Sequence, residues 1–464
     1  MTERLAKSVG GLLMLAGALL VAVAAAAPGK LDPGFGSGGV AVTATAPGAG
    51  DDGQNGLAIQ TDGRIVVGGS SDMGAAAGGH QWRISRYTYK GELDGRFGAG
   101  GTVTTSMSSA GGFDEHVWNL ALDGNGRIVA AGDAVTATGG FDVALARFNA
   151  DGTLDTSFGT AGKVTTAVGP GTRRDRAHDV AVLVDGKILV AGFADMGSGA
   201  GGRNFMVARY NPDGTLDGSF GSGGIVVTSV APGDNSDVIT TNGLTIDPVG
   251  RILVTGQANM GTGAGGVNSA LARYLPSGAL DSSFDGDGIV STAVASADNF
   301  DTLVGAAINA DGKIVTAGAA DAGGFVFDLA LLRYNPDGSL DASFGTGGKV
   351  MLNVGPGNTD DLPQDLVVQT TGRILVGGGV AATAVEVDGD FLVARFNADG
   401  SLDASFGTGG IVRTSTAPGA ADDEIFEIAL QSDAKLVASG ECEQLSTGRD
   451  VCVARYKTGE AGSD

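Results

Sequence analysis

Residues 208–221 read Ala-Arg-Tyr-Asn-Pro-Asp-Gly-Thr-Leu-Asp-Gly-Ser-Phe-Gly, and close variants of this stretch recur along the chain. It joins two phrases, a small residue before Arg-Tyr or Arg-Phe and then Leu-Asp-x-x-Phe. Successive arginines are 60 to 64 residues apart, and such a period with strand-like segments indicates an array such as a solenoid or propeller. The arginines are Arg86, Arg147, Arg209, Arg273, Arg333, Arg395 and Arg455. The second phrase begins at Leu31, Leu93, Leu154, Leu216, Leu280, Leu340 and Leu402.

Each repeat contains four strand-like segments. Leu57-Ala58-Ile59 leads through the turn Asp62-Gly63 into Ile65-Val66-Val67, which predicts a hairpin. The second segment is apolar at consecutive positions, and this indicates a strand buried on both faces. The third segment carries the arginine and ends in a Pro-Asp-Gly or Ala-Asp-Gly turn, and the fourth follows Leu-Asp. Four strands per unit without helical periodicity predict a propeller blade.

The repeats also predict how the ring closes. In every complete copy the arginine and the aspartate are eight residues apart across a turn, as in Arg209 and Asp217, which predicts an ion pair. Asp32 has no upstream arginine and Arg455 has no downstream aspartate, so each is expected to be the other's partner. We therefore predict an all-β fold, a single seven-bladed β-propeller of four-stranded antiparallel blades in which the N-terminal strand completes the last blade.

These phrases resemble the delta-60 repeat, a bacterial β-propeller repeat family with Asp-Gly-Lys-Ile, Ala-Arg-Tyr-Asn-Pro-Asp-Gly and Leu-Asp-x-Ser-Phe-Gly-x-Gly-Gly motifs. The resemblance covers Leu31 to Tyr456, and residues 208–221 are a nearly complete copy. The fifth repeat departs from the pattern with Phe284-Asp285-Gly286-Asp287-Gly288, and the last repeat has Asp433-Ala434 in place of Asp-Gly. The resemblance implies a propeller fold and no particular activity.

The N-terminal segment of the chain is typical of a secretory signal peptide. Arg4 and Lys7 precede an apolar run from Val9 to Val23, and Ala24-Ala25-Ala26 follows as a cleavage site. The run is about 15 residues long, short of the roughly 20 that span a bilayer, although a membrane anchor is the competing interpretation. We predict a signal peptide over residues 1–26, a propeller over 31–457 and a polar C-terminal tail over 458–464. The mature protein is expected to be exported, either secreted or periplasmic.

The charge of the chain limits its partners. The formal net charge is −23, and phosphate binding relies on Lys and Arg, so nucleic acid is not an expected partner. We expect an unidentified glycan or protein ligand, no membrane span in the mature chain, and a monomer. The negative net charge is also explained without any ligand, because it helps to keep an exported protein soluble.

The two cysteines of the chain lie close together in the last repeat. Cys442 and Cys452 flank a polar loop, and an exported protein meets an oxidising environment. We therefore predict a disulfide between them. Two buried free thiols are the alternative.

A carboxylate recurs twelve residues before the Arg or Lys of each second strand. The fourth repeat has Ile239 at this position and Asp237 two residues earlier. If the first strand lines the central channel, these acids form a ring near its mouth that could bind Ca²⁺ through oxygen ligands. Alternatively, each acid caps its own turn by accepting backbone amides. The six residues are Asp52, Glu115, Asp175, Asp301, Asp361 and Asp423.

The position two residues before each first apolar run is fixed in register but differs in chemistry between repeats. Aromatic and amide side chains at such a position suit binding of a sugar or peptide, and packing at the entrance of the strand is the alternative. Six of these residues are candidate ligand contacts, and Val304 is the seventh member. The candidates are Asn55, Trp118, His178, Asn242, Gln364 and Phe426.

No catalytic motif in the sequence names a reaction. Gly-x-Gly-x-x-Gly occurs at Gly197 and Gly261 without a following helix, and Gly-x-Ser-x-Gly does not occur. The leading hypothesis is an exported binding or interaction module that uses the face with the variable loops, because variable loops on a rigid scaffold carry binding residues. The alternative is a secreted carbohydrate-active enzyme, a lyase or hydrolase, with carboxylates and Ca²⁺ at the channel mouth.

Overall fold

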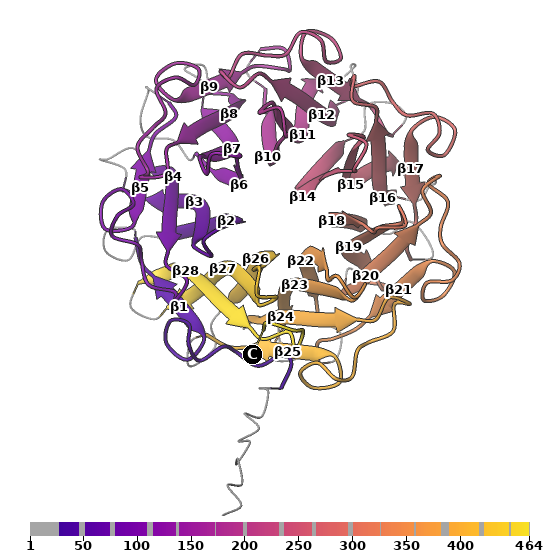
Figure 1. Ribbon diagram of the computed structural model, residues 1–464. Helices are drawn as coiled ribbons and strands as arrows, with labels where there is room; N and C mark the ends of the chain where they lie inside the picture. The colour runs from indigo at the N-terminus through magenta and orange to yellow at the C-terminus, as the bar shows by residue number, and fades with distance from the viewer. Residues whose placement is uncertain are drawn as a thin grey trace, which may run out of the picture.

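The computed structural model describes most of the chain after the predicted signal peptide. Within the described residues the strands form seven four-stranded antiparallel sheets, arranged as blades around a central axis (Figure 1). The predicted seven-bladed β-propeller is confirmed. No helix in this part of the chain is long and apolar enough to cross a membrane. The described residues are 27–45, 52–74, 79–108, 115–135, 139–171, 173–197, 202–231, 236–261, 266–295, 300–324, 326–356, 359–381, 389–416, 422–444 and 447–463.

The first strand of each repeat lies at the axis and begins on one face of the ring (Figure 1). Each pairs with one neighbour only, the second strand of its own blade. These innermost strands are β2 (Asp52–Ile59), β6 (Val117–Leu122), β10 (Arg176–Val182), β14 (Asp237–Ile246), β18 (Asp301–Ile308), β22 (Asp361–Val368) and β26 (Asp423–Leu430).

The second strands form the buried middle of the blades, as their consecutive apolar residues predict. Ile65, Val66 and Val67 are all completely buried. Each hydrophobic cluster is shared by two neighbouring blades, for example Val129 of one blade with Val190 of the next. The second strands are β3 (Ile65–Asp72), β7 (Ile128–Val135), β11 (Ile188–Gly197), β15 (Ile252–Gly261), β19 (Ile314–Asp321), β23 (Ile374–Ala381) and β27 (Leu436–Gln444).

The third strands carry the repeated arginines at their C-terminal ends. Tight turns follow them, and the same face of the ring holds the turns between first and second strands. In the last repeat Ala434 replaces glycine at such a turn and keeps the left-handed conformation, with φ of 61°, at roughly 1–2 kcal/mol for a residue with a Cβ. The third strands are β4 (His80–Tyr87), β8 (Phe141–Phe148), β12 (Gly202–Tyr210), β16 (Gly266–Tyr274), β20 (Phe327–Tyr334), β24 (Gly389–Phe396) and β28 (Gly448–Tyr456).

The outermost strands are short, and one of them comes from the N-terminal end of the propeller. β1 pairs antiparallel with β28, so the last blade has the order β26, β27, β28, β1. Closure of the ring by the N-terminal strand is therefore confirmed. The outermost strands are β5 (Thr102–Thr105), β9 (Lys163–Thr166), β13 (Ile225–Thr228), β17 (Ile289–Thr292), β21 (Lys349–Leu352), β25 (Ile411–Thr414) and β1 (Val40–Thr43).

A buried ion pair joins the third strand of each blade to the Leu-Asp-x-x-Phe phrase of the same blade. The nitrogen–oxygen distances are 2.7 to 3.0 Å, and Asp32 pairs with Arg455 as predicted. Each guanidinium also lies over the phenylalanine of the same Leu-Asp-x-x-Phe phrase, 4.4 to 4.7 Å from the ring centroid. The pairs are Arg86–Asp94, Arg147–Asp155, Arg209–Asp217, Arg273–Asp281, Arg333–Asp341, Arg395–Asp403 and Arg455–Asp32.

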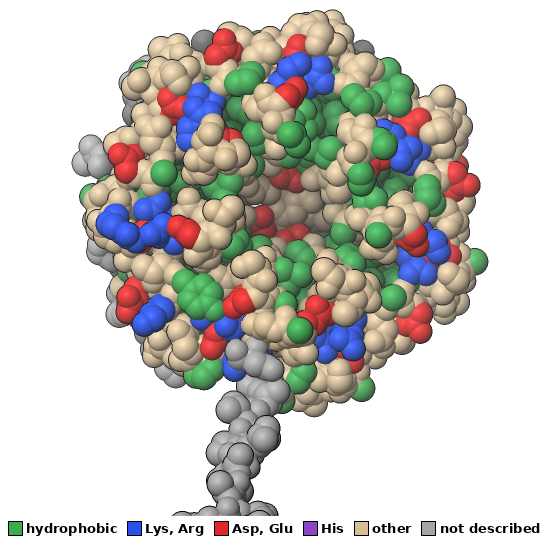
Figure 2. Space-filling view, viewed as in Figure 1, with side chains coloured by type: hydrophobic (Ala, Val, Ile, Leu, Met, Phe, Trp, Pro, Cys, Tyr) green, Lys and Arg blue, Asp and Glu red, His purple; other side chains and the backbone are tan. Residues whose placement is uncertain are grey.

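The same arginines link each blade to the next one. Each donates through Nη1 to a backbone carbonyl in the turn of the following blade, and Arg455 of the last blade donates to Tyr89 of the first at 2.5 Å. Figure 2 shows this face, with basic and acidic side chains next to one another around a central hollow. The acceptors, in order from Arg86, are Ala150, Pro212, Pro276, Pro336, Ala398, Thr458 and Tyr89.

Two features are confined to the last blade. Cys442 of β27 and Cys452 of β28 are joined by a disulfide, with their Cα atoms 5.8 Å apart. A cross-link that closes so short a loop contributes roughly 2–3 kcal/mol in the chain-entropy description. In the C-terminal segment, Thr458 accepts the hydrogen bond of Arg395 that turn residues accept in the other blades.

Candidate functional site

The two faces of the ring differ in their connections. The tight turns occupy one face, and the longer connections between second and third strands and between blades occupy the other, which we call the variable face. The recurring carboxylates lie at or just before the starts of the innermost strands, and the candidate ligand contacts lie within these strands.

The recurring carboxylates are buried and accept backbone amide hydrogens from the connection that precedes them. Each is at most 2% exposed. Burial is the largest influence on the pKa of Asp361 and raises it to about 6, while the amides of Val354 and Gly355 oppose the rise. The acceptor–donor sets are Asp52 with Thr45, Glu115 with Met107 and Ser108, Asp175 with Val168 and Gly169, Asp237 with Val230 and Ala231, Asp301 with Val294, Asp361 with Val354 and Gly355, and Asp423 with Thr416.

These contacts support the turn-cap interpretation of the carboxylates. Asp237 takes the same role in the fourth blade, two residues earlier, because the bulge of β14 contains two more residues than the others. Among the described residues, no three His, Cys, Asp or Glu side chains are grouped so as to hold a metal ion. A calcium ion would have to compete with the backbone donors, so Ca²⁺ binding stays a prediction.

The chemically variable position coincides with a β-bulge in every innermost strand. The residue at this position is skipped by the pairing register between first and second strands. A bulge re-aims side chains and often adjoins a functional site. The bulged residues are Asn55, Trp118, His178, Asn242, Val304, Gln364 and Phe426.

The bulge of β14 extends across the axis of the ring. Asn242 has a φ of 58°, a left-handed conformation that Asn tolerates better than most residues. Its Nδ2 donates to the carbonyls of Gln364 at 3.2 Å and Phe426 at 3.0 Å, in the sixth and seventh blades. Its Oδ1 accepts from Asn119 of the second blade at 2.9 Å. One side chain thus joins four blades at the axis.

Three acids follow bulges and line the axis beside Asn242. Asp179 accepts from the amide of Leu244 at 2.7 Å, and Asp365 accepts from that of Ile428 at 2.9 Å, so each bonds to the next blade. Burial raises the pKa of Asp179 to about 7. Burial also raises the pKa of Asp365 and Glu427, and mutual repulsion among the three carboxylates raises them further. Glu427 Oε2 is a buried oxygen without a hydrogen-bond partner among the described residues.

Trp118 and His178 belong to a continuous row of aromatic rings that runs from the first blade to the third. Their centroids are 5.1 Å apart, and His116 lies 5.7 Å from Trp118. His80 and Phe193 extend the row at its two ends, at 5.9 and 5.3 Å. Burial lowers the pKa of His178 to about 4, so its ring is neutral at pH 7.

Two arginines lie over rings of this row, and two others line a pocket beside it. Arg176 lies over Trp118 at 5.6 Å, and Arg203 lies over Phe193 at 4.9 Å. Arg174 lies over Phe141 at 5.2 Å, and Arg173 pairs with Asp195 at 3.3 Å. We call Arg173, Arg174, Arg176 and Arg203 the arginine cluster. It borders an open pocket of about 610 Å³.

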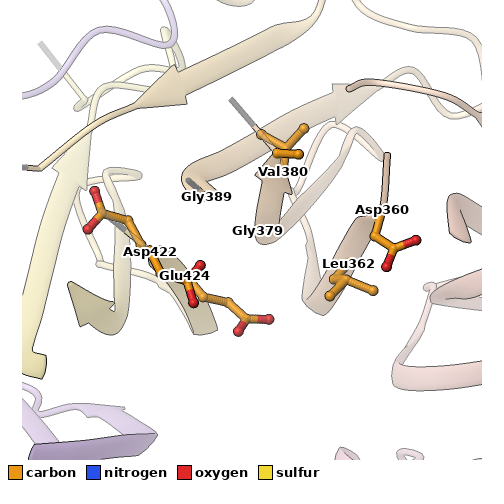
Figure 3. A pocket seen from close by; sticks show the side chains of 9 residues that line it. Asp360, Leu362, Gly379, Val380, Gly389, Asp422 and Glu424 are labelled. Atoms are coloured by element: carbon orange, nitrogen blue, oxygen red, sulfur yellow. The ribbon is translucent and has the colours of Figure 1, made fainter. Parts of the chain in front are cut away.

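The sixth and seventh blades present an acidic pocket on the same face. It has a volume of about 200 Å³, and Asp360 and Leu362 of one blade face Asp422 and Glu424 of the next (Figure 3). Glu424 Oε1 accepts from Gln364 Nε2 at 2.7 Å. Burial raises the pKa of Glu424 to about 7, the hydrogen bond from Gln364 opposes this, and Asp422 adds to it.

The structure brings some of the candidate ligand contacts together and separates others. Trp118 and His178 share the aromatic row, while Asn242 meets Gln364 and Phe426 through their backbone carbonyls. Asn55 instead donates to the carbonyl of Val117 at 3.2 Å. Sequence reasoning missed the arginine cluster, the axial acids and Glu424. The sequence Arg173-Arg174-Asp175-Arg176 was a signal, because it is a basic run in a strongly acidic chain.

Comparison with protein families identifies the repeats. Six segments match a family described as a domain of unknown function (DUF5122) beta-propeller. These segments of the chain are therefore similar to the repeats of a β-propeller family. The matched segments are residues 60–97, 124–158, 185–220, 250–284, 310–344 and 369–406.

Several solved structures match the chain at low sequence identity. A protein of unknown function from Dyadobacter fermentans is 13% identical, with 92% of this chain and 99% of that chain covered and a TM-score of 0.47. A catalytically inactive virginiamycin B lyase from Staphylococcus aureus with quinupristin is 10% identical, with 89% and 99% covered and a TM-score of 0.46. Polysaccharide lyase Uly1 is 11% identical, with 87% and 89% covered and a TM-score of 0.47. No curated protein matches the chain in sequence.

Proposed function

We propose that the protein is an exported β-propeller that binds a glycan or protein ligand through its variable face. The observation that carries the proposal is the sector of the second and third blades where the aromatic row meets the arginine cluster. Large aromatic side chains beside arginines are the residue types that dominate binding surfaces. The ion pairs of the opposite face are repeated in every blade, whereas this combination is not.

Export rests on the segment before residue 27. Its charged start, apolar run and Ala-Ala-Ala site have the order of a cleavable signal. The disulfide between Cys442 and Cys452 suits an oxidising compartment. We therefore propose that the mature protein is located in the periplasm or outside the cell.

The test is a ligand screen on the mature protein. Glycan and protein arrays, followed by thermal shift, should identify a ligand that raises the melting temperature, because binding to the native state alone stabilises it. Replacing Trp118 with Ala should weaken that binding. Replacing Val184 with Ser is the matched control, since Val184 is fully exposed on the tight-turn side of the same blade sector. Equal binding by both variants and the wild type would contradict the use of the variable face.

The acidic pocket favours a second candidate function, a carbohydrate-active enzyme. A carboxyl group with a pKa of about 7 in a concave site can act as a general acid near neutral pH, and Glu424 has this property. The test is release of reducing ends from a polysaccharide panel by the wild type and by Glu424→Gln. Loss of activity in the variant with an unchanged melting temperature supports catalysis. A wild type that cleaves no member of the panel leaves binding as the function.

A further inference from the structure

We propose that the arginine cluster binds the acidic groups of an acidic oligosaccharide whose sugar rings lie along Trp118 and its neighbouring aromatic side chains. This inference rests on the proposed function and names its ligand class. The cluster is a local concentration of positive charge in a chain of net charge −23. Arg173, Arg174 and Arg203 line one pocket with a single acidic residue, Asp195.

Two carboxylates form ion pairs with arginines of the cluster. Asp195 pairs with Arg173 at 3.3 Å, and Asp133 pairs with Arg176 at 3.0 Å. Asp175 lies between two of the arginines in sequence, but its carboxylate is buried and accepts the amides of Val168 and Gly169.

Repulsion between the arginines of the cluster affects the pKa of Arg176. Burial lowers the pKa of Arg176, Asp133 raises it, and the charges of Arg174 and Arg203 lower it again. A bound anion would relieve this repulsion. Guanidinium groups also bind carboxylate and sulfate groups with two parallel hydrogen bonds, which adds geometric selectivity.

The aromatic rings hold the guanidinium groups in place and supply apolar surface for the rest of the ligand. Arg174 and Arg176 both lie over Phe141, at 5.2 and 5.1 Å. Trp118 is anchored by a hydrogen bond of 3.0 Å from its Nε1 to Asp133. A rigid aromatic wall beside charged groups suits a ligand with both ring faces and acidic substituents. The negative charge of the whole protein disfavours a long nucleic acid, which needs many cationic contacts.

The experiment titrates trigalacturonate into the mature protein and follows the heat of binding. Its methyl ester is the matched neutral ligand, and a single-stranded DNA oligomer and polyglutamate are the rival anions. The double variant Arg174→Gln with Arg203→Gln should bind trigalacturonate about tenfold more weakly or worse, because two charge-assisted contacts are lost. Binding by the wild type should also weaken as salt is raised.

Arg449→Gln provides the matched control. Arg449 lies on the variable face of the last blade with its side chain 51% exposed, so the variant removes a charge from the same face away from the cluster. It should bind like the wild type, and all variants should melt like the wild type. Equal binding by the double variant, tighter binding of the ester, or stronger binding of DNA or polyglutamate would overturn the inference. If neutral sugars alone bind and Trp118→Ala abolishes this, the proposed function stands and the inference fails.

Discussion

The seven repeated Arg–Asp pairs, which we call the ion-pair ring, lie on one face, and the arginine cluster lies on the other. Arginine stabilises the fold in the ion-pair ring, and we propose that it binds a ligand in the cluster. In the ion-pair ring every blade has an arginine, an aspartate and a phenylalanine in the same places, and each arginine also bonds to the next blade. In the arginine cluster the residues come from one sector, and three of them line one pocket with a single acidic residue, Asp195. Repeated residues mark the contacts that stabilise the ring, because a residue needed at every interface between blades must recur in every blade. The sites without repetition are the ones free to serve a ligand.

The pKa values of carboxylates in the ion pairs and of carboxylates at the axis are shifted in opposite directions. In the ion-pair ring, the Ser157 hydroxyl and then Arg147 lower the pKa of Asp155 to about 2, against the effect of burial. At the axis, burial raises the pKa of Asp179 to about 7. A lowered pKa adds stability that is lost when the pH falls, whereas a raised pKa adds stability that is lost when the pH rises.

Removal of the closing strand should have the largest effect. Deleting residues 30–43 removes β1 and Asp32 and leaves the guanidinium of Arg455 buried without its carboxylate. We expect a loss of more than about 3–5 kcal/mol, the cost of breaking one buried ion pair. Denaturant unfolding of the deletion variant and of the mature protein measures the difference. Coincident unfolding curves would show that the N-terminal strand does not close the ring.

Loss of a single repeated arginine should come next. Arg273→Met leaves Asp281 buried with only Arg251, at 3.7 Å, as a distant cationic partner, so we expect a loss of about 3–5 kcal/mol. Arg174→Met on the variable face is the control, and we expect a change within about 0.5 kcal/mol. Chemical denaturation gives both values. Similar losses in the two variants would remove the distinction between the faces.

The axial acids should produce a smaller, pH-dependent effect. Glu427 has a raised pKa, caused first by burial and then by Asp365 and Asp179. The native state therefore binds more protons than the unfolded state, and stability should fall as the pH rises from about 5 to 8. Glu427→Gln should make this fall shallower, because the variant no longer binds that proton. Melting curves across this range are the measurement, and a wild type that gains stability toward pH 8 would contradict the assignment.

The turn caps should show the smallest effect. Asn retains one acceptor oxygen, so Asp361→Asn and Asp301→Asn should each change the free energy of unfolding by about 1 kcal/mol or less. Millimolar Ca²⁺ should leave the melting temperature of the wild type unchanged. A calcium-dependent rise that both variants lose would instead establish the carboxylate ring as a metal site.

The architecture could be predicted because the same sequence motifs recur in every blade. The spacing of eight residues between arginine and aspartate recurs in every repeat, and the orphaned Asp32 and Arg455 follow the same rule. An interaction that must form between any two adjacent blades is visible in a single sequence as a period. The same reasoning found the buried second strands, whose apolar residues are consecutive in every copy.

The contacts across the axis could not be predicted in this way. Asn242 reaches Gln364 and Phe426 because the bulge of its strand contains two extra residues and adopts a left-handed conformation. The sequence contains a trace of this, since the spacing of 64 residues before Arg273 is the longest of the series. Spacing alone does not reveal which part of a repeat holds the extra residues, or that they point inward.

The arginine cluster was missed for a related reason. Arg174 and Arg203 come from the start of two different strands of one blade and meet only when the sheet forms. Counting by repeats drew attention to Asp175, which recurs, and away from its neighbours, which do not. Residues that depart from the repeat therefore need the structure to show what they share.

The most direct test of the division between the faces is hydrogen exchange of the mature protein with and without trigalacturonate. The account predicts slower exchange at the starts of β10 and β12, around residues 173–178 and 202–205, and unchanged exchange in the tight turn at residues 211–217. Protection of the tight turn, with none at the two strand starts, would contradict it.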